Sequence, residues 1–239
     1  MRLTIEKAWQ LMSENNGSLD LSFSDITELP DNLTVNGDMS LSHAKITKLP
    51  ENLTVKGTLY CDNTNITEIP QSLIVKENLE LSFSKIKMLP DNMTINGDLG
   101  LSFSSIERLP RNLTVKGDFK CDGTSLEEIP ENLYVGGDIS LCHSKKSVKF
   151  PENLIVNGDL NISHSKINEL PKELTTKRNL IANNCELRTL PIRLSVGLSL
   201  YLMNTPVKII PETVEIGHKI FSGKLIAKYL TNPDETDII

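Results

Sequence analysis

Three of the four histidines of this 239-residue chain fall at one recurring position of its sequence. This position, called the rim column below, holds Phe23, His43, Asn63, Phe83, Phe103, Gly123, His143, His164, Asn184 and Asn204. Imidazoles are metal ligands, but a zinc site needs three or four ligands that converge. His43 lies roughly five copies of the pattern away from His143, and the pair His143 and His164 has no further ligand beside it. The histidines therefore predict no metal site.

The phenylalanines of the rim column permit two interpretations. Phe83 and Phe103 belong to adjacent copies of the pattern, so their rings should lie side by side at an edge of the array. Aromatic side chains that stack between neighbouring strands have a structural role. Exposed aromatic rings are also frequent anchors at protein interfaces. The sequence leaves both interpretations open.

A second recurring position is mostly acidic. Its members, called the ladder column below, include Asp38, Thr58, Asn78, Asp98, Asp118, Asp138 and Asp159. In stacked copies these side chains would lie about 4.8 Å apart. Carboxylates at that spacing can bind a cation. The alternative is a hydrated edge at which water screens the charges from one another.

A search for catalytic motifs returns nothing. The chain has no His-x-x-x-His, no Cys-x-x-Cys and no glycine-rich phosphate loop. No set of Ser, His and Asp has a catalytic spacing. We therefore predict that the protein is not an enzyme and binds no cofactor. A catalytic site at the rim near His143 and His164 is an alternative hypothesis for the function.

These columns exist because the chain repeats itself every 20 residues. The stretch DNMTINGDLGLSFSSIERLP at 91–110 has close copies at 31–50, 51–70, 71–90, 111–130 and 131–151, and weaker copies as far as Pro211. A fixed period of this length is typical of a solenoid, in which each copy covers the apolar faces of its neighbours.

Each copy reads as a short strand, a turn and an extended return. Leu99 and Leu101 alternate like a strand with one buried face. Three positions later the small residue Ser104 allows a turn, in which its hydroxyl can satisfy backbone groups. Ile106 returns to the core, and the Leu-Pro step that follows disfavours a helix. We expect the glycine before the strand, here Gly97, to permit a tight bend.

The pattern Leu-x-Leu-x-x-(small)-x-Ile-x-x-Leu-Pro-x-x-Leu resembles leucine-rich repeats. The 20-residue period and the Leu-Pro step are similar to the short class found in secreted bacterial effectors and in phage-encoded proteins. The resemblance covers residues 18–211. It implies a leucine-rich-repeat solenoid that coils right-handedly, with short parallel strands on the concave face and extended segments on the convex face. This chain departs from the family in one respect: Ser, Thr, Ala or Cys replaces the usual turn asparagine.

We expect an N-terminal helical cap at 1–17, about ten repeats at 18–211, and a C-terminal cap and tail at 212–239. Ile5, Ala8, Trp9 and Met12 recur at helical spacing. A helix there would cover the open apolar end of the array, although Trp9, the only tryptophan, is alternatively a binding anchor. We predict a short helix at 224–230 and a loose tail at 232–239.

The period slips by one residue between Pro130 and Pro151, where the sequence reads LCHSKKSVKFP. Lys145, Lys146 and Lys149 form a small basic spot at the slip. The segment is either a contact for an acidic partner or a tolerated surface insertion.

Composition excludes several classes of partner and location. A net charge of −6 argues against nucleic-acid binding, which needs clustered Lys and Arg. No apolar run approaches the roughly 18 residues of a membrane span, and the N-terminus does not read as a secretory signal. The four cysteines are not spaced for disulfides, so we expect unpaired thiols in a cytoplasmic protein.

The residue between the two leucines of each copy should face outward from the strands. This position, called the outward column below, holds Ser40, Tyr60, Glu80, Gly100, Lys120, Ser140, Asn161, Ile181 and Tyr201. Such variety on a constant framework is expected of a recognition surface, and equally of an unselected surface.

We predict that the protein recognises a protein partner without catalysis, through the concave face. The resemblance to bacterial and phage proteins implies an effector that inhibits a host or defence protein. The residues expected to contact the partner are Tyr60, Glu80, Phe83, Phe103, Lys120, His143, His164 and Tyr201. The second hypothesis is a structural protein that self-assembles through its strand face or an open end.

Overall fold

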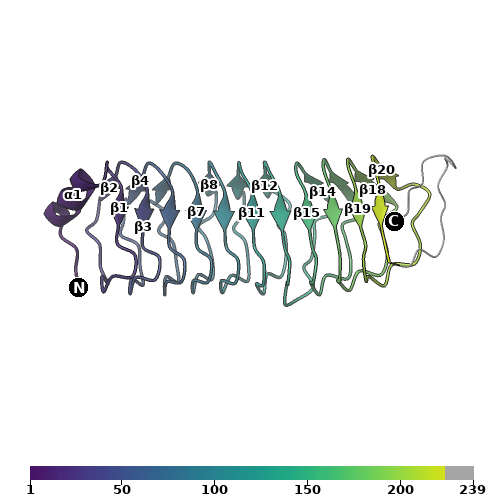
Figure 1. The fold of residues 1–239 in the computed structure, drawn as a ribbon, viewed down its shortest axis with the longest axis horizontal. Coiled ribbons are helices and arrows are strands. Elements are labelled where there is room, and N and C mark those ends of the chain that lie inside the picture. The colour runs from purple at the N-terminus through teal and green to yellow at the C-terminus, as the bar shows by residue number, and fades with distance from the viewer. Residues whose placement is uncertain (224–239) are drawn as a thin grey trace.

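Successive 20-residue copies form the turns of a parallel β-solenoid of about ten turns with a single N-terminal helix. The computed structural model describes residues 1–223. The turns follow one another along a nearly straight axis, and the helix lies at one end of the stack (Figure 1). The repeat solenoid predicted from the period is therefore confirmed.

One eleven-stranded parallel sheet runs along the described solenoid. Its strands are β1 (Leu19–Asp20), β3 (Met39–Ser40), β5 (Leu59–Tyr60), β7 (Leu79–Glu80), β9 (Leu99–Gly100), β11 (Phe119–Lys120), β13 (Ile139–Ser140), β15 (Leu160–Asn161), β17 (Leu180–Ile181), β19 (Leu200–Tyr201) and β21 (Ile220–Phe221). The register pairs equivalent residues of neighbouring copies, so that Leu79 lies opposite Leu99 and Glu80 opposite Gly100. The sequence columns are therefore spatial columns.

The return limbs form three shorter parallel sheets on the other side of the solenoid. The first contains β2 (Thr34–Val35), β4 (Thr54–Val55) and β6 (Ile74–Val75); the second β8 (Thr94–Ile95), β10 (Thr114–Val115) and β12 (Tyr134–Val135); the third β14 (Asn153–Val156), β16 (Glu173–Thr176), β18 (Arg193–Val196) and β20 (Glu215–Ile216). The extended return predicted from the Leu-Pro step is therefore confirmed, and it also pairs from turn to turn.

The turn that precedes each return strand adopts a different backbone conformation at the two breaks between these sheets. Asn52 and Asn112 have positive φ, a conformation that asparagine tolerates. The equivalent residues Ser72 and Asn132 do not. In those two turns the N–H groups of the following leucines, Leu73 and Leu133, donate to the carbonyl oxygens of Pro70 and Pro130 instead. The sheets end at β6 and β12, the strands that these turns precede.

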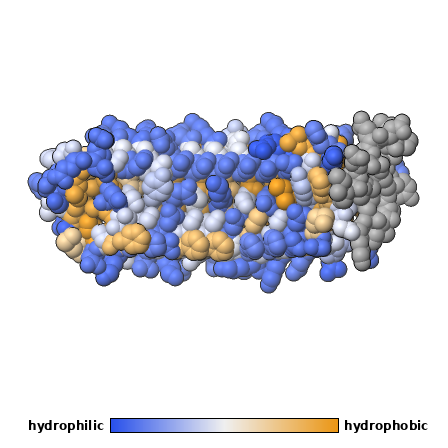
Figure 2. All heavy atoms as spheres, in the orientation of Figure 1, coloured by the Kyte–Doolittle hydropathy of each residue, from blue (hydrophilic) through white to orange (hydrophobic). Residues whose placement is uncertain are grey.

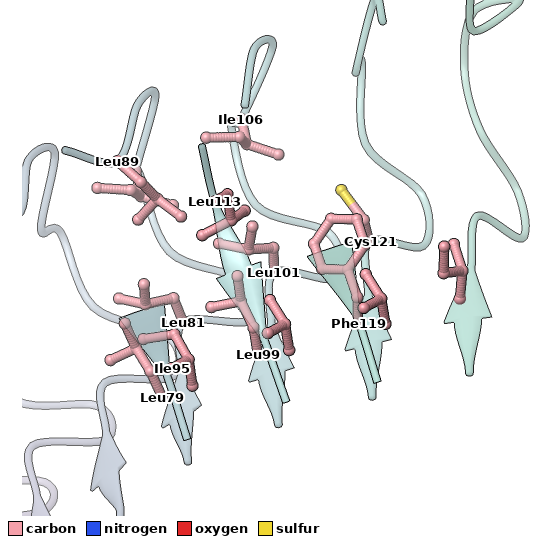
Figure 3. Packing of buried hydrophobic residues seen from close by; sticks show 14 of the residues in the cluster. Leu79, Leu81, Leu89, Ile95, Leu99, Leu101, Ile106, Leu113, Phe119 and Cys121 are labelled. Carbon is pink, nitrogen blue, oxygen red and sulfur yellow. The ribbon is translucent and has the colours of Figure 1, made fainter. Parts of the chain in front are cut away.

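The core is a continuous stack of aliphatic side chains between the two strand layers. Leu99 and Leu101 are fully buried, and Figure 3 shows Leu79, Leu99 and Phe119 in line from strand to strand. Phe119 is larger than the leucine it replaces, and its neighbour two residues on, Cys121, is smaller than leucine. Such a volume-conserving exchange keeps the stack close-packed.

The small residues of the turn satisfy the backbone as predicted. The hydroxyl of Ser84 donates to the carbonyl oxygen of Leu81 at 2.6 Å, and that of Thr64 to the carbonyl oxygen of Cys61 at 2.7 Å. Both side chains are buried. A narrow hydroxyl side chain therefore satisfies the backbone of these turns.

Helix α1 (Ile5–Glu14) caps the first turn of the solenoid. The side chain of Thr4 accepts a hydrogen bond from the N–H of Lys7, which fixes the start of the helix. Ala8 and Met12 are buried, but Trp9 is 60% exposed. The predicted N-terminal helix is confirmed, and Trp9 lies outside its buried face.

The one-residue slip is absorbed as a surface bulge. Val148 is buried and takes the place of the core isoleucine. The ammonium of Lys146 lies 2.9 Å from a carboxylate oxygen of Glu127. Beyond the slip, the return strands β14, β16 and β18 have four residues instead of two.

Strands β20 and β21 continue the stacking beyond Pro211. The helix predicted at 224–230 and the tail predicted at 232–239 lie outside the described residues. Within residues 1–223, no helix has the length and apolar character needed to cross a membrane.

Candidate recognition surface

The outward column lines the outer face of the eleven-stranded sheet. Tyr60 and Glu80 are direct neighbours, and Lys120 lies two strands beyond Glu80. Tyr201 lies four strands further, where its ring stacks on Phe221 with the ring centroids 4.6 Å apart. The structure therefore places these four predicted residues on one face but not in one patch. Phe221 was missed because the last copy has lost the consensus.

The rim column forms an exposed edge of stacked rings beside this face. Ring centroids lie 4.4 Å apart in the pair Phe23 and His43, 4.9 Å in Phe83 and Phe103, and 5.0 Å in His143 and His164. Figure 2 shows apolar side chains interrupting the hydrophilic lower rim. The structural ladder is therefore present, yet Phe83 and Phe103 remain 54% and 46% exposed.

Every residue of the rim column from Phe23 to Asn204 has positive φ, which is 57° at both Phe83 and Phe103. Asparagine and glycine adopt this conformation readily, whereas a bulky side chain there is strained. Sequence reasoning missed this conformation. The available signal was the alternation of Asn63, Gly123 and Asn184 with the aromatic residues at one position.

The ladder column is a chain of hydrogen bonds along the solenoid. Oδ1 of Asp98 accepts from the N–H of Asp118, and Oδ1 of Asp118 accepts from the N–H of Asp138, each at 2.8 Å. Asn78 and Asn179 have the same role in their turns. Among residues 1–223 no three His, Cys, Asp or Glu side chains converge as metal ligands. The column is accounted for by this ladder.

The glycines beside the ladder have a different role from the one predicted. The bend is present, but Gly57, Gly97 and Gly117 do not have positive φ. A Cβ atom at Gly117 would lie 2.1 Å from Oδ1 of Asp98. At Gly117 the ladder side chain of the preceding turn occupies the space that a Cβ atom would take, and positive φ is not the reason for the glycine.

Asp62 and Glu80 form an acidic pair between the sheet face and the rim. The pKa of Glu80 is raised above its ordinary value. Burial is the largest cause, and repulsion from Asp62 is the second. Burial also raises the pKa of Asp62, whose Oδ1 accepts from the N–H of Ser82 at 2.9 Å. Attraction by Lys120 offsets only part of the effect at Glu80. The ion pairs of the described residues involve neither carboxylate.

Gly100 lets the Glu80 side chain lie across the sheet. A Cβ atom at Gly100 would be only 1.8 Å from Oε2 of Glu80, so the carboxylate fills the space left by the missing side chain. Asp62 was not among the predicted contact residues. The 20-residue repeat does not indicate that the Glu80 side chain extends over the next strand, or that the Asp62 carboxylate repels that of Glu80.

His143 and His164 are both exposed and stack on one another. The pair lies on the rim two to three turns from Phe103, and His43 stacks on Phe23 instead. The structure therefore brings the two predicted histidines together without a third ligand in the described part of the chain.

No protein-family model matches this chain, and no curated protein is similar to it.

Proposed function

We propose that the protein is a non-catalytic recognition module that binds a protein partner through the outer face of the eleven-stranded sheet. One observation carries the proposal: the two sides of this sheet differ sharply in how much they vary. The inward residues are apolar and buried in every copy from Leu19 to Leu202. The outward residues include a tyrosine, a carboxylate, a glycine, a lysine and an amide within 102 consecutive residues, 60–161.

The finer assignment that we propose is a leucine-rich repeat of the short Leu-Pro class. The consensus pattern, the 20-residue period and the short parallel strands support it. In that architecture the outer face of the main sheet is the concave, partner-binding side. The bacterial and phage occurrence of this class supports an effector that inhibits a host or defence protein.

The backbone of the rim supports a role for exposed aromatic residues. Asn63 and Asn184 show that the turn forms without an aromatic side chain. Phe83 and Phe103 keep a strained φ and a large exposed area at the same position. Stacking stabilises a pair of aromatic rings by only about 0.5–1.5 kcal/mol. Contact with a partner is a use for these rings that a purely structural ladder does not supply.

Affinity capture from a lysate of the native host tests the proposal. The face variant replaces Tyr60, Glu80, Lys120 and Tyr201 by serine, the residue already present at Ser40 and Ser140. The control replaces Thr34, Thr54, Thr94 and Tyr134 on the other side by serine, which Ser195 already provides there. We expect the wild type and the control to capture the same protein and the face variant to lose it. Equal capture by a folded face variant would contradict the proposal.

A further inference from the structure

We propose that the outer sheet face binds an extended basic segment of the partner, with an arginine side chain seated between the ring of Phe83 and the carboxylates of Asp62 and Glu80. This inference rests on the recognition function proposed above and names the chemistry of the partner.

Charge complementarity identifies the occupant. The outward column, the ladder column and the column of Asp62 together form the sheet face. The same columns carry Lys120 and Lys219, and Arg178 beside the ladder column pairs with Asp138 and Asp159. The carboxylates on these columns are Asp20, Asp38, Asp62, Glu80, Asp98, Asp118, Asp122, Asp138 and Asp159. The ladder uses one oxygen of a carboxylate for its hydrogen bond and leaves the other available. A cationic segment is therefore attracted along the length of the face.

The ring of Phe83 has one covered and one open side. One side stacks on Phe103, with an interplanar angle of 10°. The opposite side is turned toward the preceding turn, where the rim column has only the short side chain of Asn63. Asp62 is the residue before Asn63, and Glu80 lies on the strand that leads to Phe83.

A planar guanidinium fits this arrangement better than an ammonium does. It can stack on an aromatic face and donate several N–H groups to carboxylates at the same time. An arginine there would also provide the ion-pair partner that Asp62 and Glu80 lack within residues 1–223. In the structure the carboxylate of Glu80 lies over Gly100 on the following strand, so the proposed site requires Glu80 to turn back toward Asp62 when the cation binds.

The spacing of the carboxylates fits an extended segment that lies along the solenoid axis. Neighbouring turns are about 4.8 Å apart and an extended chain rises about 3.3 Å per residue. Three residues of such a segment therefore span about two turns. With its first arginine at Asp62 and Glu80, such a segment would place the next arginine near Asp122, two turns beyond Glu80.

Peptide binding measured by fluorescence anisotropy tests the inference. The probe is a labelled nine-residue peptide with arginine at every third position and glycine or serine elsewhere. A citrulline version removes the charge, and a version with the three arginines adjacent removes the spacing. The variants are Phe83→Asn, Asp62→Ser and Glu80→Ser, each of which occurs at the equivalent position of another turn, as in Asn63, Ser42 and Ser40. Tyr134→Thr, on the other side of the solenoid, is the matched control, because Thr114 holds that position.

We expect each of the three variants to weaken binding of the spaced arginine peptide at least about fivefold, and Tyr134→Thr to leave it unchanged. The citrulline peptide should bind at least about tenfold more weakly than the arginine peptide. Equal binding of the two peptides, or unchanged binding by Phe83→Asn and Glu80→Ser, would overturn the inference. Equal binding of the clustered peptide would overturn the proposed register along the axis.

The capture experiment and the peptide experiment fail independently. A partner that is captured through the face while the arginine peptide does not bind would leave the recognition function standing and remove the basic segment. The opposite result is peptide binding at Phe83 together with equal partner capture by the wild type and the face variant. It would support this site and contradict the proposed function.

Discussion

The carboxylate of Glu80 is held where burial and other acids disfavour its charge. Burial is the largest cause of its raised pKa, and repulsion from Asp62 is the next. Asp98 adds to the repulsion, and Lys120 opposes it. A charged Glu80 therefore makes the folded state less favourable than a neutral side chain of the same shape would. Binding of a cation is the event that would remove this penalty.

Glu80→Gln should consequently stabilise the protein at pH 7, by less than about 1 kcal/mol because the side chain is only partly buried and solvent screens it. In the wild type the penalty is present above the raised folded-state pKa. It is relieved as the pH falls through that value, and it vanishes below the ordinary value of 4.5, where both states are neutral. The advantage of the variant should therefore shrink toward zero as the pH is lowered to about 4. Urea unfolding across this pH range measures it, and an advantage that grew on acidification would contradict the assignment.

The positions of the candidate contact residues were predictable, but their conformations were not. Alternation along the strand and the 20-residue period place Tyr60, Glu80 and Lys120 in one column, as the register confirms. The positive φ of Phe83 was hidden because phenylalanine rarely adopts it. The coupling of Glu80 to Asp62 depends on where a long side chain points, and no spacing rule determines that.

Among the elements, the ladder column links each turn to the next by a side chain. The N–H of Asp118 donates to Asp98, and Oδ1 of Asp118 accepts from the N–H of Asp138. The backbone N–H is partly buried, so it needs an acceptor. The same bond is made by Asn78, which accepts from the N–H of Asp98 at 2.7 Å. An amide oxygen therefore meets the geometric requirement as well as a carboxylate does.

Asp118→Ala should lower the free energy of unfolding by about 1–2 kcal/mol, because the N–H of Asp138 loses its acceptor. Asp118→Asn should stay within about 0.5 kcal/mol of the wild type, since the weaker acceptor is offset by less repulsion along the column. Denaturant titrations of both variants measure the difference. Equal destabilisation by the two would show that charge, and not the hydrogen bond, is what the ladder contributes.

The elements themselves were largely predictable from the repeat. The strand, the hydroxyl turn and the extended return all follow from the pattern of one copy and are present in the structure. The breaks between the return sheets could not be predicted, because they depend on whether one turn residue, such as Ser72, adopts positive φ. The place of Val148 in the core at the slip was also undecided, because three neighbouring residues competed for that position.

At the scale of the whole molecule, the solenoid is a one-dimensional stack of turns. Each turn contacts only its neighbours, so a defect at an end loosens the outermost turns first. The N-terminal end is closed by α1 through Ala8 and Met12. Without this helix, strand β1 and the first core leucine, Leu19, would be open to another chain. An open strand edge with apolar surface favours association between molecules.

Ala8→Asp tests whether the helix closes this end. Ala8 is fully buried, so a carboxylate there should cost at least about 3 kcal/mol or displace the helix. We expect a lower unfolding midpoint and a scattering mass that rises with concentration more steeply than in the wild type. Trp9→Ala is the matched control: Trp9 is the next residue on the same helix but is 60% exposed, so its loss should change stability by less than about 0.5 kcal/mol. If Ala8→Asp left both the midpoint and the scattering unchanged, the helix would be an appendage of the solenoid and the array would tolerate an open end.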